Sequence, residues 1–300
     1  MAKRYDLIII GSGPAGLTAA IYAARYKINF IVLGKTLGGM AGKAHEIVNF
    51  PSYEKITGVE LIQKIEKQAK TLGVEVIQEE VLEIKKNNGF DIKTDKNKYS
   101  TKKIILATGT AKGKLNLANE DNLIGHGVSY CATCDAGFFK NKTVGVYGGG
   151  NSALNSALLL SKFAKKVYII YRRDKFSKAE PVLTEQINKN NKISKIFNSE
   201  IIRLGGKNSL KEIVITTNGK KRGLNMDGLF VEIGNIPDDR LAKQLNLKFD
   251  GDYIEVNKKQ ETTAKGVFAA GDITNNPLKQ IITSCAEGAI AADSVYHELK

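Results

Sequence analysis

The stretch Tyr5-Asp6-Leu7-Ile8-Ile9-Ile10-Gly11-Ser12-Gly13-Pro14-Ala15-Gly16 decides the fold of this chain. Its aliphatic run predicts a parallel strand that is buried on both faces, and its last six residues match the pattern G-x-G-x-x-G. An alanine-rich helix is expected over residues 17–26. Gly11 would allow the tight turn, Gly13 the approach of a pyrophosphate, and Gly16 the packing of helix on strand. The stretch therefore predicts a dinucleotide site, with a plain structural turn as the alternative.

The strand that follows this helix shows which nucleotide the site does not favour. Residues 29–33 predict this second strand, and it ends in Gly34-Lys35. A site for NAD usually has an acidic residue here, which binds the ribose. The absence of that acid argues against NAD at the first glycine loop.

A second glycine loop lies 137 residues further on. Thr143–Tyr147 predicts a strand, and Gly148-Gly149-Gly150-Asn151-Ser152-Ala153 then matches G-x-G-x-x-A and opens a helix. The next strand, residues 167–171, ends in Arg172-Arg173. Two guanidinium groups suit a phosphate dianion, so this loop predicts NADPH.

Between the two loops lies the segment Cys131-Ala132-Thr133-Cys134-Asp135. Two thiols at this spacing can form a redox pair, half of a zinc site, or an inert pair. Zinc needs four ligands, and the other candidates do not form a second close-spaced pair; they are Cys285, His45, His126 and His297. No metal site is therefore expected. A helix starting at the pair would lower the pKa of one sulfur, and Asp135 is a candidate proton donor or acceptor.

Composition sets the class of protein. A chain of 300 residues with 42% hydrophobic residues is long enough for two domains. Three cysteines do not make a disulfide framework, so a reducing cytoplasm is expected, and no run approaches the ~20 apolar residues of a membrane span. The net charge of +14 comes mostly from scattered lysines. It predicts a solvated surface or the steering of an acidic partner, and nucleic-acid binding is not expected.

Several further stretches have two interpretations each. Thr108-Gly109 ends a strand and either lets a flat group approach the backbone or is only a turn. Asp272 follows the strand that ends in Gly271, and it either binds polyol hydroxyls or caps a helix. Residues 57–72 predict a helix with a capping box, and residues 193–217 predict a small meander.

Taken together, the chain resembles the low-molecular-weight thioredoxin reductases from end to end. The matching segments occur in the order and at the spacing of that family: Gly11–Gly16, Gly38-Gly39, Asn49-x-Pro51, Ala107-Thr108-Gly109, Tyr130–Asp135, Gly148–Ala153, Arg172-Arg173-Asp174, Gly266–Asp272 and Lys279-Gln280.

The resemblance implies an α/β fold of two Rossmann-like three-layer (ββα-type) nucleotide-binding domains. Residues 1–112 and 241–300 would form a discontinuous FAD-binding domain, and residues 113–240 an inserted NADPH-binding domain that carries the redox pair. The inserted domain would rotate about crossovers near residues 112–116 and 240–241. The family is usually a homodimer.

The resemblance also implies a role for each matching position. Cys134 would exchange electrons with the flavin, Cys131 would attack the disulfide of a partner protein, and Asp135 would be the acid–base residue. The cofactor-binding positions would be Gly11, Ser12, Gly13, Pro14, Ala15, Gly16, Lys35, Gly38, Gly39, Met40, Asn49, Val81, Thr108, Gly109, Gly150, Asn151, Ser152, Arg172, Arg173, Lys178, Gly271, Asp272, Lys279, Gln280 and Ile281.

The chain departs from the family at a few of these positions. Ser177, followed by Lys178, stands where a third basic residue usually follows the arginine pair, which weakens the preference for NADPH without reversing it. Met40 replaces a common glutamine and Lys279 a common arginine, so both should loosen contacts to FAD slightly. Cys285 has no catalytic counterpart and is expected to be a buried structural thiol.

The implied activity is reduction of the disulfide of a thioredoxin-like protein, with electrons from NADPH through FAD and the Cys131–Cys134 pair. One alternative is a related flavin dithiol enzyme: a reductase of a glutaredoxin- or peroxiredoxin-system partner, or a dithiol oxidase that uses oxygen. Another is a flavin-binding scaffold protein without turnover, against which the intact pair and both glycine loops argue.

Overall fold

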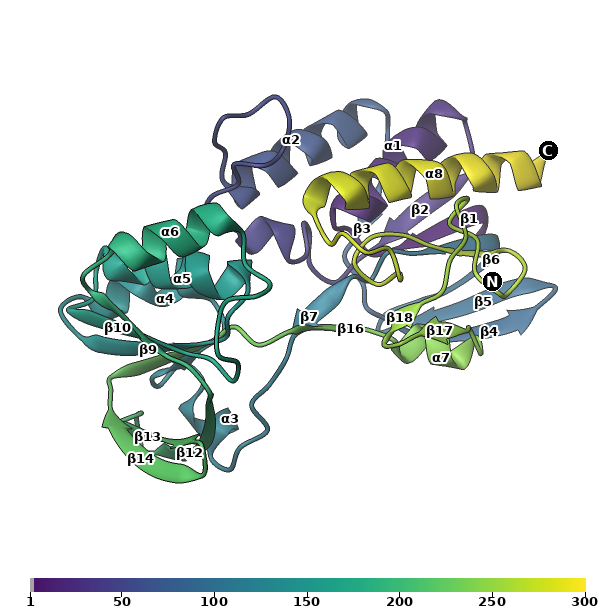
Figure 1. Cartoon of the computed structure of the whole chain (residues 1–300). Helices are drawn as coiled ribbons and strands as arrows, with labels where there is room; N and C mark the ends of the chain where they lie inside the picture. The colour runs from purple at the N-terminus through teal and green to yellow at the C-terminus, as the bar shows by residue number, and fades with distance from the viewer. Residues whose placement is uncertain (1–2) are drawn as a thin grey trace. The chain divides into compact units, whose positions relative to one another are not determined.

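The computed structural model describes residues 3–300, which form two compact units (Figure 1). Unit 1 holds the chain up to Ala111 together with Ile236–Lys300, and unit 2 is Lys112–Asn235. Unit 2 is therefore an insertion in unit 1. Within residues 3–300, the longest apolar helices fall short of what a membrane crossing requires.

Unit 1 is built from a parallel sheet with antiparallel strands attached to it. Its strands are β1 (Lys3–Ile10), β2 (Phe30–Leu33), β3 (Val76–Ile77), β4 (Val81–Asn87), β5 (Gly89–Thr94), β6 (Lys98–Leu106), β17 (Phe249–Asp250), β18 (Tyr253–Ile254) and β19 (Val267–Ala269). Its helices are α1 (Pro14–Arg25), the 3-10 helix η1 (Ala41–Lys43), α2 (Gly58–Thr71), α7 (Arg240–Gln244) and α8 (Ile281–Leu299).

The main sheet of unit 1 has the order β3-β2-β1-β6-β5-β4. The second half of β6 also pairs in parallel with β19, while its first half pairs antiparallel with β5. Alternate residues of β1 face opposite sides: Leu7 and Ile9 pack against α1 and α8, and Ile8 and Ile10 pack towards β4, β5 and α7. This strand is buried on both faces, as its unbroken apolar run predicts.

The helix starts of unit 1 follow from local sequence. Helix α2 begins with a capping box in which Thr57 accepts from the Glu60 amide and the Glu60 carboxylate accepts from the Thr57 amide, as predicted. Helix α8 packs closely on α1, because a Cβ on Gly288 would lie 2.1 Å from the carbonyl oxygen of Ala15. This contact places the C-terminal helix beside the first glycine loop.

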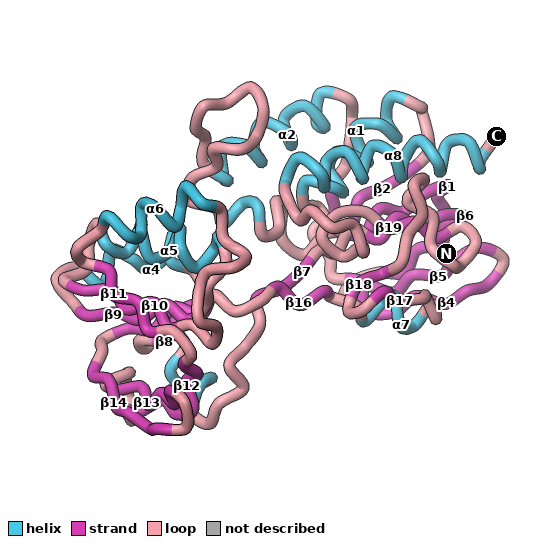
Figure 2. The backbone as a smooth tube through the Cα atoms, viewed as in Figure 1, coloured by secondary structure: helices cyan, strands magenta, loops and turns pink. Residues whose placement is uncertain are grey.

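Unit 2 contains a five-stranded parallel sheet and a three-stranded meander (Figure 2). Its strands are β8 (Val128–Ser129), β9 (Thr143–Tyr147), β10 (Lys166–Ile170), β11 (Ile193–Ile196), β12 (Ser199–Gly205), β13 (Glu212–Thr217), β14 (Lys220–Asn225) and β15 (Gly228–Val231). Its helices are α3 (Glu120–Leu123), α4 (Ala132–Asp135), the 3-10 helix η2 (Ala136–Phe139), α5 (Asn151–Ser161) and α6 (Pro181–Lys189). The parallel sheet has the order β11-β10-β9-β15-β8.

The two faces of this sheet are covered differently. Helices α4, η2, α5 and α6 pack on one face, and the meander β12-β13-β14 packs on the other. The expected meander over residues 193–217 needs a correction. Ile193–Ile196 instead pairs in parallel with β10, and β14 supplies the third strand of the meander. Both units thus have three layers, and the predicted α/β fold class is confirmed.

The two crossovers between the units pair with each other. Strands β7 (Thr110–Lys112) and β16 (Asn235–Pro237) form a two-stranded sheet. The second crossover therefore lies a few residues before the expected Arg240–Leu241, which instead begins α7. The sequence of β16 contains Pro237, and proline is tolerated only at the margin of a sheet.

Candidate functional site

The first glycine loop has the geometry of a dinucleotide cradle. Gly11 has φ +116°, and a Cβ there would lie 2.1 Å from the carbonyl oxygen of Ala107. A Cβ on Gly16 would lie 1.9 Å from the Gly11 oxygen, whereas one on Gly13 would meet nothing within 4 Å. Pro14 opens α1, whose start has neither a side-chain cap nor an acidic residue. The open space at Gly13 and the free amides fit a pyrophosphate.

Other predicted residues lie against this loop. The Gly38 amide donates to the Ser12 carbonyl at 2.8 Å, and the Ser12 hydroxyl donates to the Thr36 carbonyl at 3.1 Å. Gly39 packs near Gly13, since a Cβ on Gly39 would lie 3.7 Å from the Gly13 Cα. The loop that continues through Met40 is thereby fixed beside the cradle.

Gly109 offers a second open approach to the backbone. It has φ +65°, and a Cβ there would meet nothing within 4 Å. Thr108, the residue before it, donates its hydroxyl to the Asp238 carbonyl at 3.4 Å. The ends of β1 and β6 thus face the same edge of the sheet, where nucleotides bind in parallel sheets.

Asp272 follows β19 and lies next to the glycine loop. A Cβ on the preceding Gly271 would lie 3.0 Å from the Cβ of Ala15. Burial raises the pKa of Asp272, and its carboxylate accepts from the Ser284 hydroxyl at 3.2 Å. Helix α8 begins later and has Gln280 as its N-cap, so Asp272 does not cap it. A desolvated carboxyl group with one such donor fits the hydroxyls of a polyol chain.

The residues before α8 are partly engaged within the protein. The Lys279 ammonium donates to the Thr274 carbonyl and lies 4.3 Å from the centre of the Tyr253 ring. Burial lowers the pKa of Lys279. Asn49 donates to the Gln280 side chain at 3.0 Å, which links the Asn49 loop to the start of α8. Ile281 is the first residue of that helix.

Two of the residues predicted to bind FAD, Lys35 and Val81, have side chains that are engaged elsewhere in unit 1. Lys35 forms an ion pair of 2.6 Å with Glu80, and Arg240 also contacts Glu80 at 3.3 Å. The charge at this strand end is therefore neutralised within unit 1. The Val81 side chain is buried in the core, so only its backbone can face a cofactor.

The second glycine loop repeats the design in unit 2. Gly150 is the N-cap of α5, a Cβ there would meet nothing within 4 Å, and the first turn has no acidic residue. The Asn151 side chain accepts from the Glu180 amide at 2.8 Å and donates to its carboxylate at 2.7 Å. Gly150 forms a bridge with Lys178, and Ser152 is exposed. The segment of Lys178 therefore lies beside the loop.

The arginine pair at the end of β10 is exposed. Arg172 and Arg173 have no carboxylate partner among the described residues, and Arg173 donates to the Ser177 hydroxyl at 3.3 Å. Ser177 thus supports one arginine instead of adding a charge. Two free guanidinium groups beside an uncapped helix start fit a phosphate dianion.

Cys131 and Cys134 form a disulfide at the start of α4, with a Cα–Cα distance of 5.3 Å. Cys131 is the N-cap, and the Cys134 amide donates to the Cys131 sulfur at 3.2 Å. A thiolate at Cys131 would keep this donor, which favours its charged form. Among the described residues, no cluster of three or more His, Cys, Asp or Glu could hold a metal ion.

Ser129 fixes Asp135 beside the pair. Its hydroxyl donates to the Asp135 carboxylate at 2.7 Å and accepts from the Cys131 amide at 3.0 Å. Ser129 itself is buried, whereas Cys131 and Asp135 are partly exposed. The sequence did not single out Ser129, although it lies only two residues before Cys131. Glu180 was also missed, because its partner Asn151 is 29 residues away.

The third cysteine, Cys285, lies within α8 in unit 1 and is partly exposed, not fully buried as expected. Burial raises the pKa of its thiol, and a hydrogen bond with Thr18 lowers it only in part. A raised pKa keeps the thiol protonated and slow to react. This agrees with a structural role.

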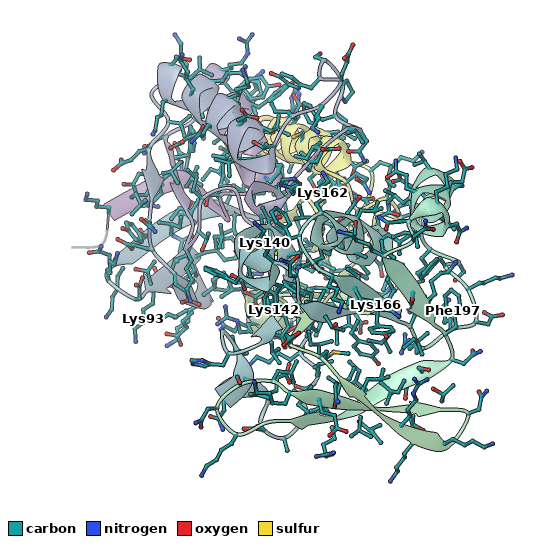
Figure 3. The ribbon with its side chains drawn as sticks, turned by 90° about the vertical axis from the view of Figure 1, so that its left-hand side faces the viewer. Lys93, Lys140, Lys142, Lys162, Lys166 and Phe197 are labelled. Atoms are coloured by element: carbon teal, nitrogen blue, oxygen red, sulfur yellow. A yellow bond between two sulfur atoms is a disulfide. The ribbon has the colours of Figure 1, made fainter. Side chains whose placement is uncertain are left out.

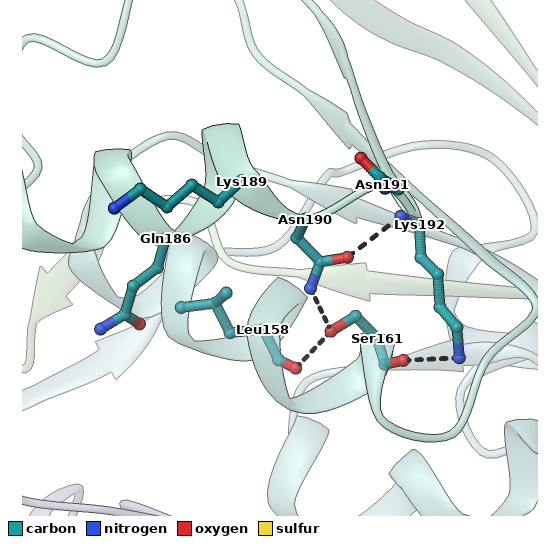
Figure 4. A pocket seen from close by; sticks show the side chains of 7 residues that line it. All are labelled: Leu158, Ser161, Gln186, Lys189, Asn190, Asn191 and Lys192. Carbon is teal, nitrogen blue, oxygen red and sulfur yellow. Dashed lines mark hydrogen bonds between the residues drawn. The ribbon is translucent and has the colours of Figure 1, made fainter.

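A shallow hollow between the ends of α5 and α6 is not a nucleotide site (Figure 4). Asn190 donates to the Ser161 hydroxyl at 2.9 Å, and the Lys192 ammonium donates to the Ser161 carbonyl at 3.1 Å. These contacts tie the turn after α6 to the end of α5. The hollow lies at the edge where the parallel strands begin, whereas nucleotides bind where they end.

Comparison with known proteins decides the family. A profile of the pyridine nucleotide-disulphide oxidoreductases matches residues 5–288. The chain belongs to this family. Thioredoxin reductase from Bacillus subtilis is 37% identical over 98% of this chain and 95% of its own length. Thioredoxin reductase from Peptoclostridium acidaminophilum is 40% identical over 97% of this chain and 96% of its own length.

A solved structure from the same group has the same fold. The crystal structure of Lactococcus lactis thioredoxin reductase aligns with a TM-score of 0.94 and 35% identity, covering 98% of each chain. The predicted resemblance is confirmed. As a pyridine nucleotide-disulphide oxidoreductase, the chain is an NADPH-dependent flavoprotein, and FAD and NADPH are its cofactors, as predicted.

Proposed function

We propose that the protein reduces the disulfide of a thioredoxin-like protein, with electrons that pass from NADPH through FAD to the Cys131–Cys134 pair. The observation that carries the proposal is this disulfide, with Asp135 held beside it by Ser129. Relatives that match nearly the whole chain are named thioredoxin reductases, which supports a thioredoxin-like substrate.

The residue assignments follow the two glycine loops. FAD would bind in unit 1, with its pyrophosphate at Gly13 and its ribityl chain at Asp272. NADPH would bind in unit 2 at the start of α5, with its phosphate on Arg172 and Arg173. The open backbone at the two loops and the absence of acidic residues in both first turns support this assignment.

The chemistry of the chain itself begins at its disulfide. Bound FAD and NADPH supply the two electrons that, with two protons, convert the disulfide to two thiols. The Cys131 thiolate then attacks the partner's disulfide, forming a mixed disulfide and releasing one partner thiolate. Cys134 attacks the Cys131 sulfur, which releases the second partner thiolate and restores the pair. Asp135 would donate or accept the proton at these sulfurs.

The proposal extends to the setting of the enzyme. We expect a homodimer in a reducing cytoplasm, where a chain with one redox pair and one unreactive thiol would be kept poised by NADPH. The partner would be a small redox protein with an accessible disulfide.

One experiment tests the function. Purified protein is titrated with NADPH, and separately with NADH, in the absence of oxygen. We expect NADPH to bleach the yellow flavin, and an oxidised thioredoxin to restore the colour within seconds. Reoxidation by dioxygen at the same rate as by the oxidised thioredoxin would identify a dithiol oxidase instead.

The two single-cysteine variants are the controls. Cys134→Ser should trap the thioredoxin on Cys131 as a covalent complex, whereas Cys131→Ser should trap it poorly. Exposure alone would favour the opposite order, because Cys134 is exposed and Cys131 is only half exposed. Non-reducing electrophoresis of both variants decides between the two assignments.

A further inference from the structure

The positive charge of this protein is concentrated in one unit. Unit 2 has 20 lysines and arginines and 10 acidic residues, a net charge of +10. Unit 1 is larger, yet its 25 basic and 21 acidic residues give only +4. The unit that carries the redox pair is therefore the strongly basic one.

The units also differ in how their charges are paired. Among residues 3–300, the ion pairs of unit 2 are Lys112–Glu232, Lys114–Asp121 and Arg203–Glu212, and the others lie in unit 1. Unit 2 thus leaves most of its basic side chains without a carboxylate partner. An unpaired surface charge acts over about 8–10 Å at physiological salt.

Five of these side chains form one surface, which we call the basic face: Lys140, Lys142, Lys162, Lys165 and Lys166. All five are exposed, and none has an ion pair among the described residues. The Lys165 and Lys166 amides donate to the Lys142 carbonyl at 2.8 and 3.4 Å, so the two segments lie side by side. Figure 3 shows four of these lysines on the same side of unit 2.

The segment of chain that carries the basic face has no acidic residue that would reduce its positive charge. Residues 136–173 contain neither aspartate nor glutamate. Asp227, which lies close by, has its carboxylate on the Thr143 amide at 2.9 Å. Lys189 and Lys192 border the hollow of Figure 4, next to the end of α5, and extend the positive surface.

The basic face lies within reach of a protein bound at the sulfur pair. The pair follows β8, and α4 and η2 run from it over α5 to Lys140. The separation between the pair and the face is therefore about the length of α5, an 11-residue helix that is roughly 16 Å long. A standard interface of about 800 Å² per partner is about 30 Å across and would cover both. Phe138, between them, is 75% exposed, as is typical of a contact residue.

We propose that the basic face docks an acidic surface of the disulfide substrate protein and steers its disulfide to Cys131. The inference rests on the proposed function and specifies the chemistry of its partner. Because the attraction acts before contact, it should raise the association rate more than it slows dissociation.

The composition of the face favours a protein over a nucleic acid. It has five lysines and no arginine, and lysine is a point charge without the planar fork that binds phosphate bidentately. Exposed Phe138 and Phe163 border it, and apolar side chains among charges are typical of protein interfaces. The carboxylates of an acidic protein surface match these features.

The test reverses the charge of Lys140, Lys162 and Lys165, whereas Lys142 and Lys166, which lie over aromatic rings, are left unchanged. We compare K140E/K162E/K165E with K207E/K220E/K221E, which makes the same change of charge on the meander side of unit 2. The probe is an oxidised thioredoxin of acidic pI. The first variant should lose about 10- to 100-fold in kcat/KM at low salt, and the control less than about threefold. At about 1 M salt the loss should shrink to about twofold.

Flavin reduction by NADPH without oxygen should be unchanged in both variants, which shows that the cofactor sites are intact. If the unaltered protein does not reduce the probe, the proposed function fails. If it does and the two variants lose equally, the docking proposal is overturned. The proposal is also overturned if K140E/K162E/K165E keeps its kcat/KM but loses salt-dependent retention on double-stranded DNA, since the face would then bind a polyanion.

Discussion

The two units follow one plan, in which a strand, a glycine loop and a helix form a cradle, but they differ at two points. At the last position of the glycine pattern, unit 1 has Gly16 and unit 2 has Ala153. At the end of the second strand, unit 1 has Lys35 in an ion pair with Glu80, whereas unit 2 has two unpaired arginines. The loop of unit 1 has no room for a Cβ at Gly16 and its strand-end charge is paired, whereas the loop of unit 2 accommodates a Cβ and its strand-end charges are unpaired.

This difference would suit ligands of different residence times, with FAD in unit 1 and NADPH in unit 2 as proposed. A cofactor that stays bound is best held by close packing and fixed dipoles, which gives slow dissociation. A cofactor and a protein partner that come and go gain more from charges that attract them at a distance. The two glycine patterns alone would not reveal this difference between the loops, because their sequences are nearly alike.

The largest effect should come from exchanging the residues at the last position of each glycine pattern. Gly16→Ala would put a Cβ 1.9 Å from the Gly11 carbonyl oxygen, so helix α1 must move. Overpacking of about 1–3 kcal/mol weakens binding about 5- to 150-fold. We expect Gly16→Ala to purify with little flavin, measured as visible absorbance per protein.

The matched control is Ala153→Gly in unit 2. It removes a methyl group from a loop that already accommodates one, and it should keep its flavin and change the KM for NADPH by less than about threefold. Equal flavin content in Gly16→Ala and the unaltered protein would remove the distinction between the two cradles.

A smaller effect is expected at the charged strand end of unit 2. Replacing Arg172 and Arg173 by Ala should raise the KM for NADPH about 10- to 100-fold and leave that for NADH nearly unchanged, because only NADPH carries the 2′-phosphate. Lys35→Ala at the equivalent place in unit 1 is the control and should not alter either KM. Parallel losses with both nucleotides would mean that the arginines do not contact the phosphate.

The smallest effect is expected at Glu79, a buried carboxylate that accepts hydrogen bonds from other residues of unit 1. Burial tends to raise the pKa of Glu79, but hydrogen bonds from Thr94, Asn97 and Tyr99 outweigh it, and the pKa falls below its ordinary 4.5. The ionised Glu79 carboxylate therefore stabilises the fold at pH values above 4.5. This contribution is lost as the pH falls through the lowered pKa of the folded state. Glu79→Gln should cost about 1–2 kcal/mol, or about 2–4 °C in Tm, at neutral pH.

Thermal melts between neutral and acid pH check this prediction. The difference between Glu79→Gln and the unaltered protein should vanish at low pH, and Glu75→Gln, at an exposed residue, should behave as the unaltered protein throughout. A constant difference at all pH values would show that the ionised form of Glu79 contributes nothing.

Much of the fold could be predicted from the sequence, because the residues that determine it lie close together in the chain. The aliphatic run before Gly11 predicts a buried strand from a few neighbouring residues. Arg172 and Arg173 predict a phosphate site in the same local way. Helix α2 could be placed from Thr57 and Glu60 alone. The spacing of the two cysteines allowed a disulfide, and the lack of a second close-spaced pair of ligands argued against zinc.

The parts that were missed depend on contacts between distant segments. The pairing of Glu80 with Arg240 joins residues 160 apart, and no periodicity encodes it. Ile193–Ile196 reads as part of a meander by its turns, yet burial against β10 makes it a parallel strand. Likewise, the second crossover is set by the pairing of β16 with β7, which the charged residues near Arg240 do not reveal.

The insertion of unit 2 has a consequence for biosynthesis. Gly271, which precedes Asp272, and helix α8 both lie against Ala15 in the first glycine loop, but they follow unit 2 in the chain, and Gly288 must pack on Ala15 across 273 residues. On the ribosome, where the N-terminal part emerges first, unit 2 can fold while unit 1 is still half made. If FAD binds in unit 1 as proposed, its capture must wait until translation has passed the inserted unit.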